Sequence, residues 1–99
     1  MKLPKSFKLF STTIKVKRNN KSLNDQNVYG QTDYEKNRIL LSKTCGVNKL
    51  SRDRVLDTFY HEKTHTVLHA MGEDDLCKNE KFVDLLARLW RQSDETAKY

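Results

Sequence analysis

The sequence is poor in the residues that staple or interrupt small folds: of its 99 residues, two are Cys, one is Pro and three are Gly. Cys45 and Cys77 are too few for the disulfide framework of a small secreted domain, and they lack the C-x-x-C spacing of a thiolate metal site. We therefore expect two free thiols in a reducing compartment.

Long apolar runs are absent too. The first 17 residues, MKLPKSFKLFSTTIKVK, never place more than two apolar residues together, which excludes the core of a secretory signal peptide. No other stretch approaches the length that spans a membrane. With 36% hydrophobic and 32% charged residues, the chain is expected to form one globular, cytoplasmic domain over residues 1–99, with a modest core and no membrane contact.

Acidic residues are scarce in the first half, which carries 11 Lys/Arg against 3 Asp/Glu, whereas residues 51–99 carry 8 against 10. A basic half of this kind attracts nucleic acid or an acidic protein, or it is simply a solvated, lysine-rich surface. No recognised DNA-reading motif accompanies the charge. The charge is therefore compatible with binding to nucleic acid, but no sequence motif indicates it.

Residue patterns before position 50 predict a short sheet. Alternation in the first segment puts Ile14 and Val16 on a buried face. Two further runs, VYGQTDY and RILLS, flank EKN in the manner of a β-hairpin. A meander of about three strands is expected, at residues 8–17, 28–34 and 38–42. Residues 18–27 are expected to form a polar loop between the first two.

Residues after position 50 predict two helices. Ser51 can cap a helix in which apolar residues recur at three- and four-residue spacings until Gly72 ends it. A second helix is predicted over residues 79–92. Its apolar stripe comprises Phe82, Leu85, Leu86 and Leu89.

All three histidines lie in FYHEKTHTVLHAMG, residues 59–72. His61 and His65, four apart on a helix, share one face and can converge on one ion, while Glu62 is rotated by about 100° toward the open side. A zinc ion there would acidify a water molecule and Glu62 would take its proton. The plainer alternative is a pair of ordinary surface histidines.

A catalytic zinc needs a third protein ligand. His69 is excluded, because it lies eight residues from His61, about 12 Å along a straight helix; a packed or substrate-side histidine is expected instead. Glu80 and Asp84 share a face of the second helix. If the helices pack antiparallel, Glu80 can ligate the metal and Asp84 can accept the other ring N–H of a ligand histidine. The alternative is a solvated charged face.

HEKTH and NEKFVD together resemble the gluzincin metallopeptidases, which carry H-E-x-x-H on one helix and N-E-x-x-x-D on the next. The resemblance covers about residues 37–92 and extends to the minimal ImmA/IrrE-type peptidases. It implies an α+β, zincin-like fold, with a short, mostly antiparallel sheet packed on the two-helix unit. It also implies three zinc ligands, His61, His65 and Glu80. By the same resemblance, Glu62 is the catalytic base and Asp84 orients a ligand histidine.

In such folds a strand at the cleft pairs with an extended substrate, and residues 38–42 or the neighbouring hairpin arm are the expected rim. The lobe that donates a hydrogen bond to the oxyanion in large gluzincins is missing here. Lys63, usually small or apolar in relatives, is expected to face solvent. The candidate oxyanion donors are Tyr34, Arg38, Tyr60 and Tyr99.

The favoured function is a zinc-dependent metalloendopeptidase that cleaves an extended segment of a protein or peptide. Intact Glu62 favours this reading, because a protein that only binds has no need of a base between the histidines. A second reading is a binding or regulatory module that keeps the metal for stability. A third is a nucleic-acid-associated protein that uses the basic first half.

Overall fold

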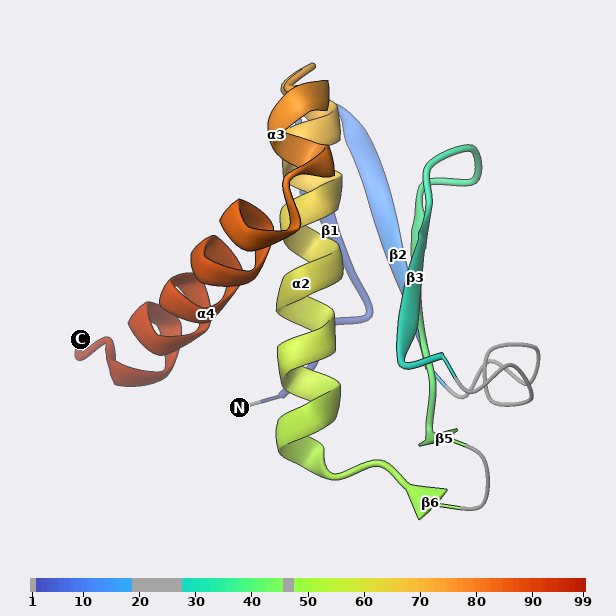
Figure 1. Ribbon diagram of the computed structural model, residues 1–99, viewed down its shortest axis with the longest axis vertical. Helices are drawn as coiled ribbons and strands as arrows, with labels where there is room; N and C mark the ends of the chain where they lie inside the picture. The colour runs from blue at the N-terminus through green and yellow to red at the C-terminus, as the bar shows by residue number, and fades with distance from the viewer. Residues whose placement is uncertain (1, 19–27, 46–47) are drawn as a thin grey trace.

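The computed structural model describes residues 2–18, 28–45 and 48–99, which form an α+β fold with a small mixed sheet and three helices (Figure 1). Most of the predicted loop at 18–27 therefore lies outside the described residues. The elements are β1 (Ser6–Leu9), β2 (Thr12–Arg18), β3 (Gly30–Asp33), β4 (Arg38–Leu41), β5 (Thr44–Cys45), β6 (Asn48–Lys49), α2 (Arg52–Ala70), α3 (Asp74–Lys78) and α4 (Glu80–Thr96).

The main sheet has the strand order β1-β2-β4-β3, which is not the predicted meander. β1–β2 and β3–β4 are antiparallel hairpins, but β2 pairs with β4 in parallel. The predicted strand at 8–17 is in fact two strands that turn at Phe10 and Ser11. Ile14 of β2 lies in one buried cluster with Ile39 and Leu41 of β4.

The predicted hairpin of residues 28–34 and 38–42 is confirmed as β3 and β4. Asn37 adopts a left-handed conformation (φ 52°) in its turn. Asp33 anchors the same turn, since its carboxylate accepts hydrogen bonds from the Lys36 amide and the Arg38 guanidinium, both at 3.1 Å. The pKa of Asp33 is lowered, mainly by the hydrogen bond from the Lys36 amide and further by Arg38.

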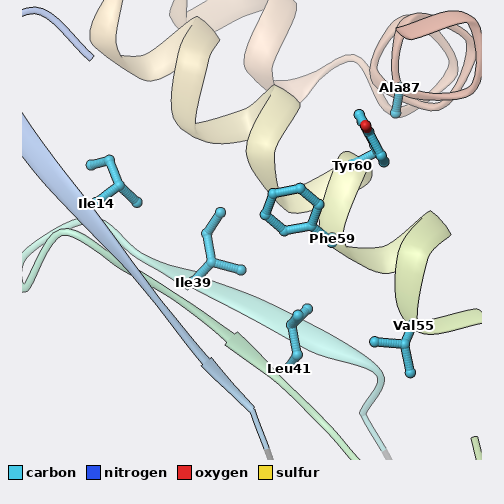
Figure 2. Close-up of a cluster of buried hydrophobic side chains, with 7 residues drawn as sticks. All are labelled: Ile14, Ile39, Leu41, Val55, Phe59, Tyr60 and Ala87. Carbon is cyan, nitrogen blue, oxygen red and sulfur yellow. The ribbon is translucent and has the colours of Figure 1, made fainter. Parts of the chain in front are cut away.

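Helix α2 is sandwiched between the sheet and α4. Figure 2 shows Phe59 of α2 directed toward the sheet residues Ile14 and Ile39, and Tyr60 directed toward Ala87 of α4. In Figure 1 all three helices gather on one side of the sheet. The layers are therefore sheet, α2 and α4, with the core between sheet and α2.

The predicted boundaries of the long helix are confirmed. The Ser51 side chain accepts a hydrogen bond from the Arg54 amide at the start of α2, and Gly72 follows its end with a φ of +75°. A left-handed residue at this position suits glycine, which has no Cβ to clash. The predicted second helix begins as expected after Asn79, which caps α4, but it continues to Thr96.

Two side-chain placements differ from expectation. Lys63 does not face solvent: its ammonium group lies 4.3 to 5.9 Å from the ring centroids of Phe7, Phe59, Tyr60 and Trp90. Its position, four residues after the sheet-facing Phe59 and three after Tyr60, places it between the sheet residue Phe7 and Trp90 of α4. The stripe of α4 is largely exposed, whereas Val83 and Ala87 are buried against α2.

No helix in the described part of the chain is long and apolar enough to cross a membrane.

Candidate metal centre

Three predicted ligands meet at one point. Nε2 of His61 lies 3.3 Å from Oε2 of Glu80, and Nε2 of His65 lies 3.3 Å from Oε1 of the same carboxylate. One candidate ligand atom from each residue falls within 4.8 Å of the other two. The two histidines come from successive turns of α2, and the carboxylate comes from the first residue of α4.

This donor set fits a zinc ion. Ligand atoms bonded at about 2.0–2.1 Å around a tetrahedral zinc lie about 3.3 Å from one another. Each histidine has one Glu80 oxygen at that distance, and the three residues offer ligand atoms within 4.8 Å of one another. Two imidazoles and one carboxylate are a ligand set of catalytic zinc sites, and they leave the fourth position for water or substrate. The residues present therefore fit the metal.

The outward nitrogens of both rings have polar partners. Nδ1 of His61 lies 2.9 Å from Oδ1 of Asp84, and Nδ1 of His65 lies 3.3 Å from Sγ of Cys77. A ring that donates from Nδ1 carries its lone pair on Nε2, which is the atom turned toward Glu80. Both rings thus turn Nε2 toward the Glu80 carboxylate and Nδ1 toward a second polar group.

The contact of Asp84 with His61 matches the geometry expected of it, whereas the contact of Cys77 with His65 was not anticipated. Cys77 lies in α3, a short helix that the sequence did not predict. Its spacing of three residues before Glu80 is the one local signal that it could reach the same site.

Glu62 is directed toward β3. One of its carboxylate oxygens accepts a 2.8 Å hydrogen bond from the Thr32 hydroxyl, which fixes the side chain beside the histidines. Glu62 and His61 line one hollow of about 400 Å³, between Gly30 of β3 and the start of α4. A second hollow of about 440 Å³ lies beyond His65.

His69 does not join the ligand cluster, as the helix geometry predicts. Its ring stacks on the ring of Tyr34, with centroids 4.3 Å apart, and both rings line the second hollow with His65 and Glu80. His69 therefore lies in the hollow beyond His65, and its neighbour Tyr34 brings a phenolic hydroxyl there.

Among the described residues, Tyr34 is the only one of the four candidate oxyanion donors that lies beside the metal centre. Its hydroxyl lies 3.5 Å from Sγ of Cys77. Burial chiefly raises the pKa of Tyr34, and the hydrogen bond to Cys77 and the nearby negative charges raise it further. Tyr60 instead donates to Asp94, Arg38 is paired with Asp33, and Tyr99 is fully exposed near the end of α4.

The strand beside the site is β3. The alternative candidate for the rim, residues 38–42, is wrong, because β4 lies between β2 and β3 in the sheet. β3 approaches α2 closely at Gly30, where a Cβ atom would lie 2.5 Å from Cγ2 of Thr58. This glycine lets the edge strand run directly alongside the histidine helix.

Comparisons with family models, with curated proteins and with solved structures found no match to this chain.

Proposed function

We propose that this protein is a zinc-dependent metalloendopeptidase with a minimal zincin-like fold of the gluzincin type. The observation that carries the proposal is the convergence of His61 and His65 Nε2 with the Glu80 carboxylate, with Glu62 held next to them. Two unrelated surface histidines have no reason to turn both Nε2 atoms toward one carboxylate. Here both do so, and both Nδ1 atoms face another polar group. The substrate class is an extended segment of a protein or peptide.

His61, His65 and Glu80 would hold the metal. A zinc ion in this place supplies Lewis-acid polarisation of the scissile carbonyl and lowers the pKa of a water molecule toward about 7. Glu62 accepts a proton from the attacking water and passes it to the departing amine nitrogen. The Thr32 hydroxyl keeps the carboxylate of Glu62 in position during both transfers.

Tyr34 donates a hydrogen bond to the oxyanion that forms on the scissile carbonyl. Its place in the hollow shared with His65 and Glu80 supports this role. The outer edge of β3 pairs with the extended substrate, since an edge strand offers backbone donors and acceptors to a peptide.

A metal-stabilised module without protease activity is the second candidate. The observation in its favour is that α4 buries only Val83 and Ala87 among its described side chains. A metal bound between α2 and α4 would add a crosslink to this small interface. The two candidates differ in Glu62, which the module does not need.

The test measures zinc content and cleavage of an unfolded protein by the wild type and two variants. The peptidase loses cleavage in Glu62→Gln with zinc retained, and it loses zinc and cleavage together in Glu80→Ala. Cleavage that survives Glu62→Gln contradicts the mechanism, and full zinc retention in Glu80→Ala contradicts the ligand assignment. A wild type that binds zinc and cleaves nothing supports the module.

A further inference from the structure

The β1–β2 hairpin carries two locally unfavourable features. Leu9 pairs with Thr12, so the loop consists of Phe10 and Ser11 alone. Phe10 occupies the first loop position with a φ of +55°, a conformation that two-residue hairpin loops usually assign to glycine. Its side chain is also 85% exposed. Neither the backbone strain nor the exposed ring helps the hairpin to fold.

Lysines crowd one face of the same hairpin. Side chains alternate along a strand, and the buried Ile14 marks the face of β2 toward α2. Lys15 and Lys17 therefore point to the opposite face. Lys8 of β1 points there too, because it pairs with Thr13. All three lysines are exposed. The helices of the described residues lie on the other side of the sheet (Figure 1).

Little negative charge offsets these lysines. Residues 1–24 contain seven Lys/Arg and no Asp or Glu. Across the sheet, Lys15 pairs directly with Arg38, a like-charged neighbour that weakens the strand pair. Asp33 faces the same way but already accepts hydrogen bonds from Lys36 and Arg38.

We propose that the β1–β2 hairpin binds single-stranded nucleic acid, with Lys8, Lys15 and Lys17 on the phosphates and Phe10 stacked on a base. Strand-borne cations that follow a phosphate backbone, together with an exposed aromatic ring, are the parts from which single-strand binding surfaces are built. A duplex satisfies the lysines but offers no unstacked base to Phe10. An acidic protein satisfies the lysines but has no base to stack on the ring.

The three lysines are separate from the metal centre, because none of them belongs to the ligands or to their hydrogen-bonded neighbours. Phe10, at the tip of the hairpin, borders a hollow that Tyr34 and His69 also line. Occupation of the hairpin would bring single-stranded nucleic acid, or a protein bound to it, to the zinc-bearing chain. The proposal does not depend on the peptidase activity.

The test measures fluorescence anisotropy of a 15-nucleotide oligothymidine with the full-length protein, from 50 to 200 mM NaCl. We expect a dissociation constant of roughly 1–100 µM at the low-salt end and a slope of log K against log salt near −2, about −0.7 for each of three phosphate contacts. Changing Lys8, Lys15 and Lys17 to Gln together removes most of this slope. The matched control changes Lys78, Lys81 and Lys98 to Gln, which alters the net charge equally and leaves the slope in place.

Phe10→Gly separates folding from binding. Glycine accepts the positive φ, so the melting temperature should rise, while loss of the stacked base weakens binding about tenfold or more with an unchanged salt slope. The proposal is overturned if the oligonucleotide does not bind at 50 mM NaCl or if the control triple variant weakens binding as much. It is also overturned if a 15-base-pair duplex or polyglutamate binds at least as tightly, or if vesicles containing phosphatidylserine bind and the oligonucleotide does not.

Discussion

At the scale of single residues, the site depends on what each histidine does with its second nitrogen. Asp84 and Cys77 lie within hydrogen-bond distance of Nδ1 of His61 and His65, so each ring is held with Nε2 toward Glu80. The sulfur of Cys77 also contacts Tyr34. One thiol thus connects a ligand to the proposed oxyanion donor.

Cys77→Ala should weaken zinc binding about tenfold, because His65 loses the acceptor that fixes its ring. Cys77→Ser restores an acceptor and should recover part of the affinity. Competition with a fluorescent zinc chelator measures both. The matched control is Cys45→Ala, and equal zinc affinity in the wild type and Cys77→Ala would contradict the role.

Tyr34→Phe should lower kcat by about 10²- to 10³-fold and leave zinc content unchanged, since it removes one donor to the oxyanion. Because the pKa of Tyr34 is raised above its usual value of 10, the hydroxyl remains a donor in alkaline solution. Steady-state kinetics at pH 7 to 9 give the comparison. A variant that changes only KM would place Tyr34 in substrate binding instead.

At the scale of elements, the two long helices and the β3–β4 hairpin followed from local patterns, whereas α3 and the strand order of the sheet did not. Ser51 and Gly72 delimit α2 through hydrogen bonds and dihedral angles within a few residues, so the sequence predicts them. The parallel pairing of β2 with β4 joins Val16 to Ile39 across a long connection, and no local pattern encodes that partner choice. Thr32 and Cys77 were missed for the same reason.

Asp33→Asn should destabilise the protein at pH 7, because the hydrogen bonds to the ionised carboxylate anchor the β3–β4 turn. The pKa of Asp33 is lowered below its usual 3.8, so its contribution is present above pH 4 and disappears as the pH falls through the folded-state pKa. Urea midpoints at pH 7 and pH 3 measure this. Glu35→Gln in the same turn is the control, and a difference that is undiminished at pH 3 would contradict this role of Asp33.

At the scale of the whole molecule, the metal centre lies where the two helical layers meet. Its ligands come from α2 and α4, and the H-E-x-x-H pattern predicted the first two because it is local to one helix. Glu80 was predicted from the face it shares with Asp84 on a second, antiparallel helix, and the gluzincin resemblance implied the same ligand. Its approach to both histidines depends on how α3 turns the chain back. The exposed stripe of α4 shows that helical periodicity indicates an apolar face without indicating what packs on it.

Zinc should therefore stabilise the fold. At a free concentration about 1,000-fold above the dissociation constant, binding adds about 4 kcal/mol to the free energy of unfolding. Thermal denaturation with zinc and with a chelator measures the shift. Glu62→Gln should keep the shift, whereas His65→Ala should lose it, and an equal shift in both variants would contradict the ligand assignment.

X-ray absorption at the zinc edge of the loaded wild-type protein tests the central claim, the two-histidine, one-carboxylate centre, most directly. We predict a shell of nitrogen and oxygen near about 2.0 Å, with two imidazole rings and no sulfur. A zinc–sulfur distance near about 2.3 Å would make Cys77 a ligand and contradict the centre described above.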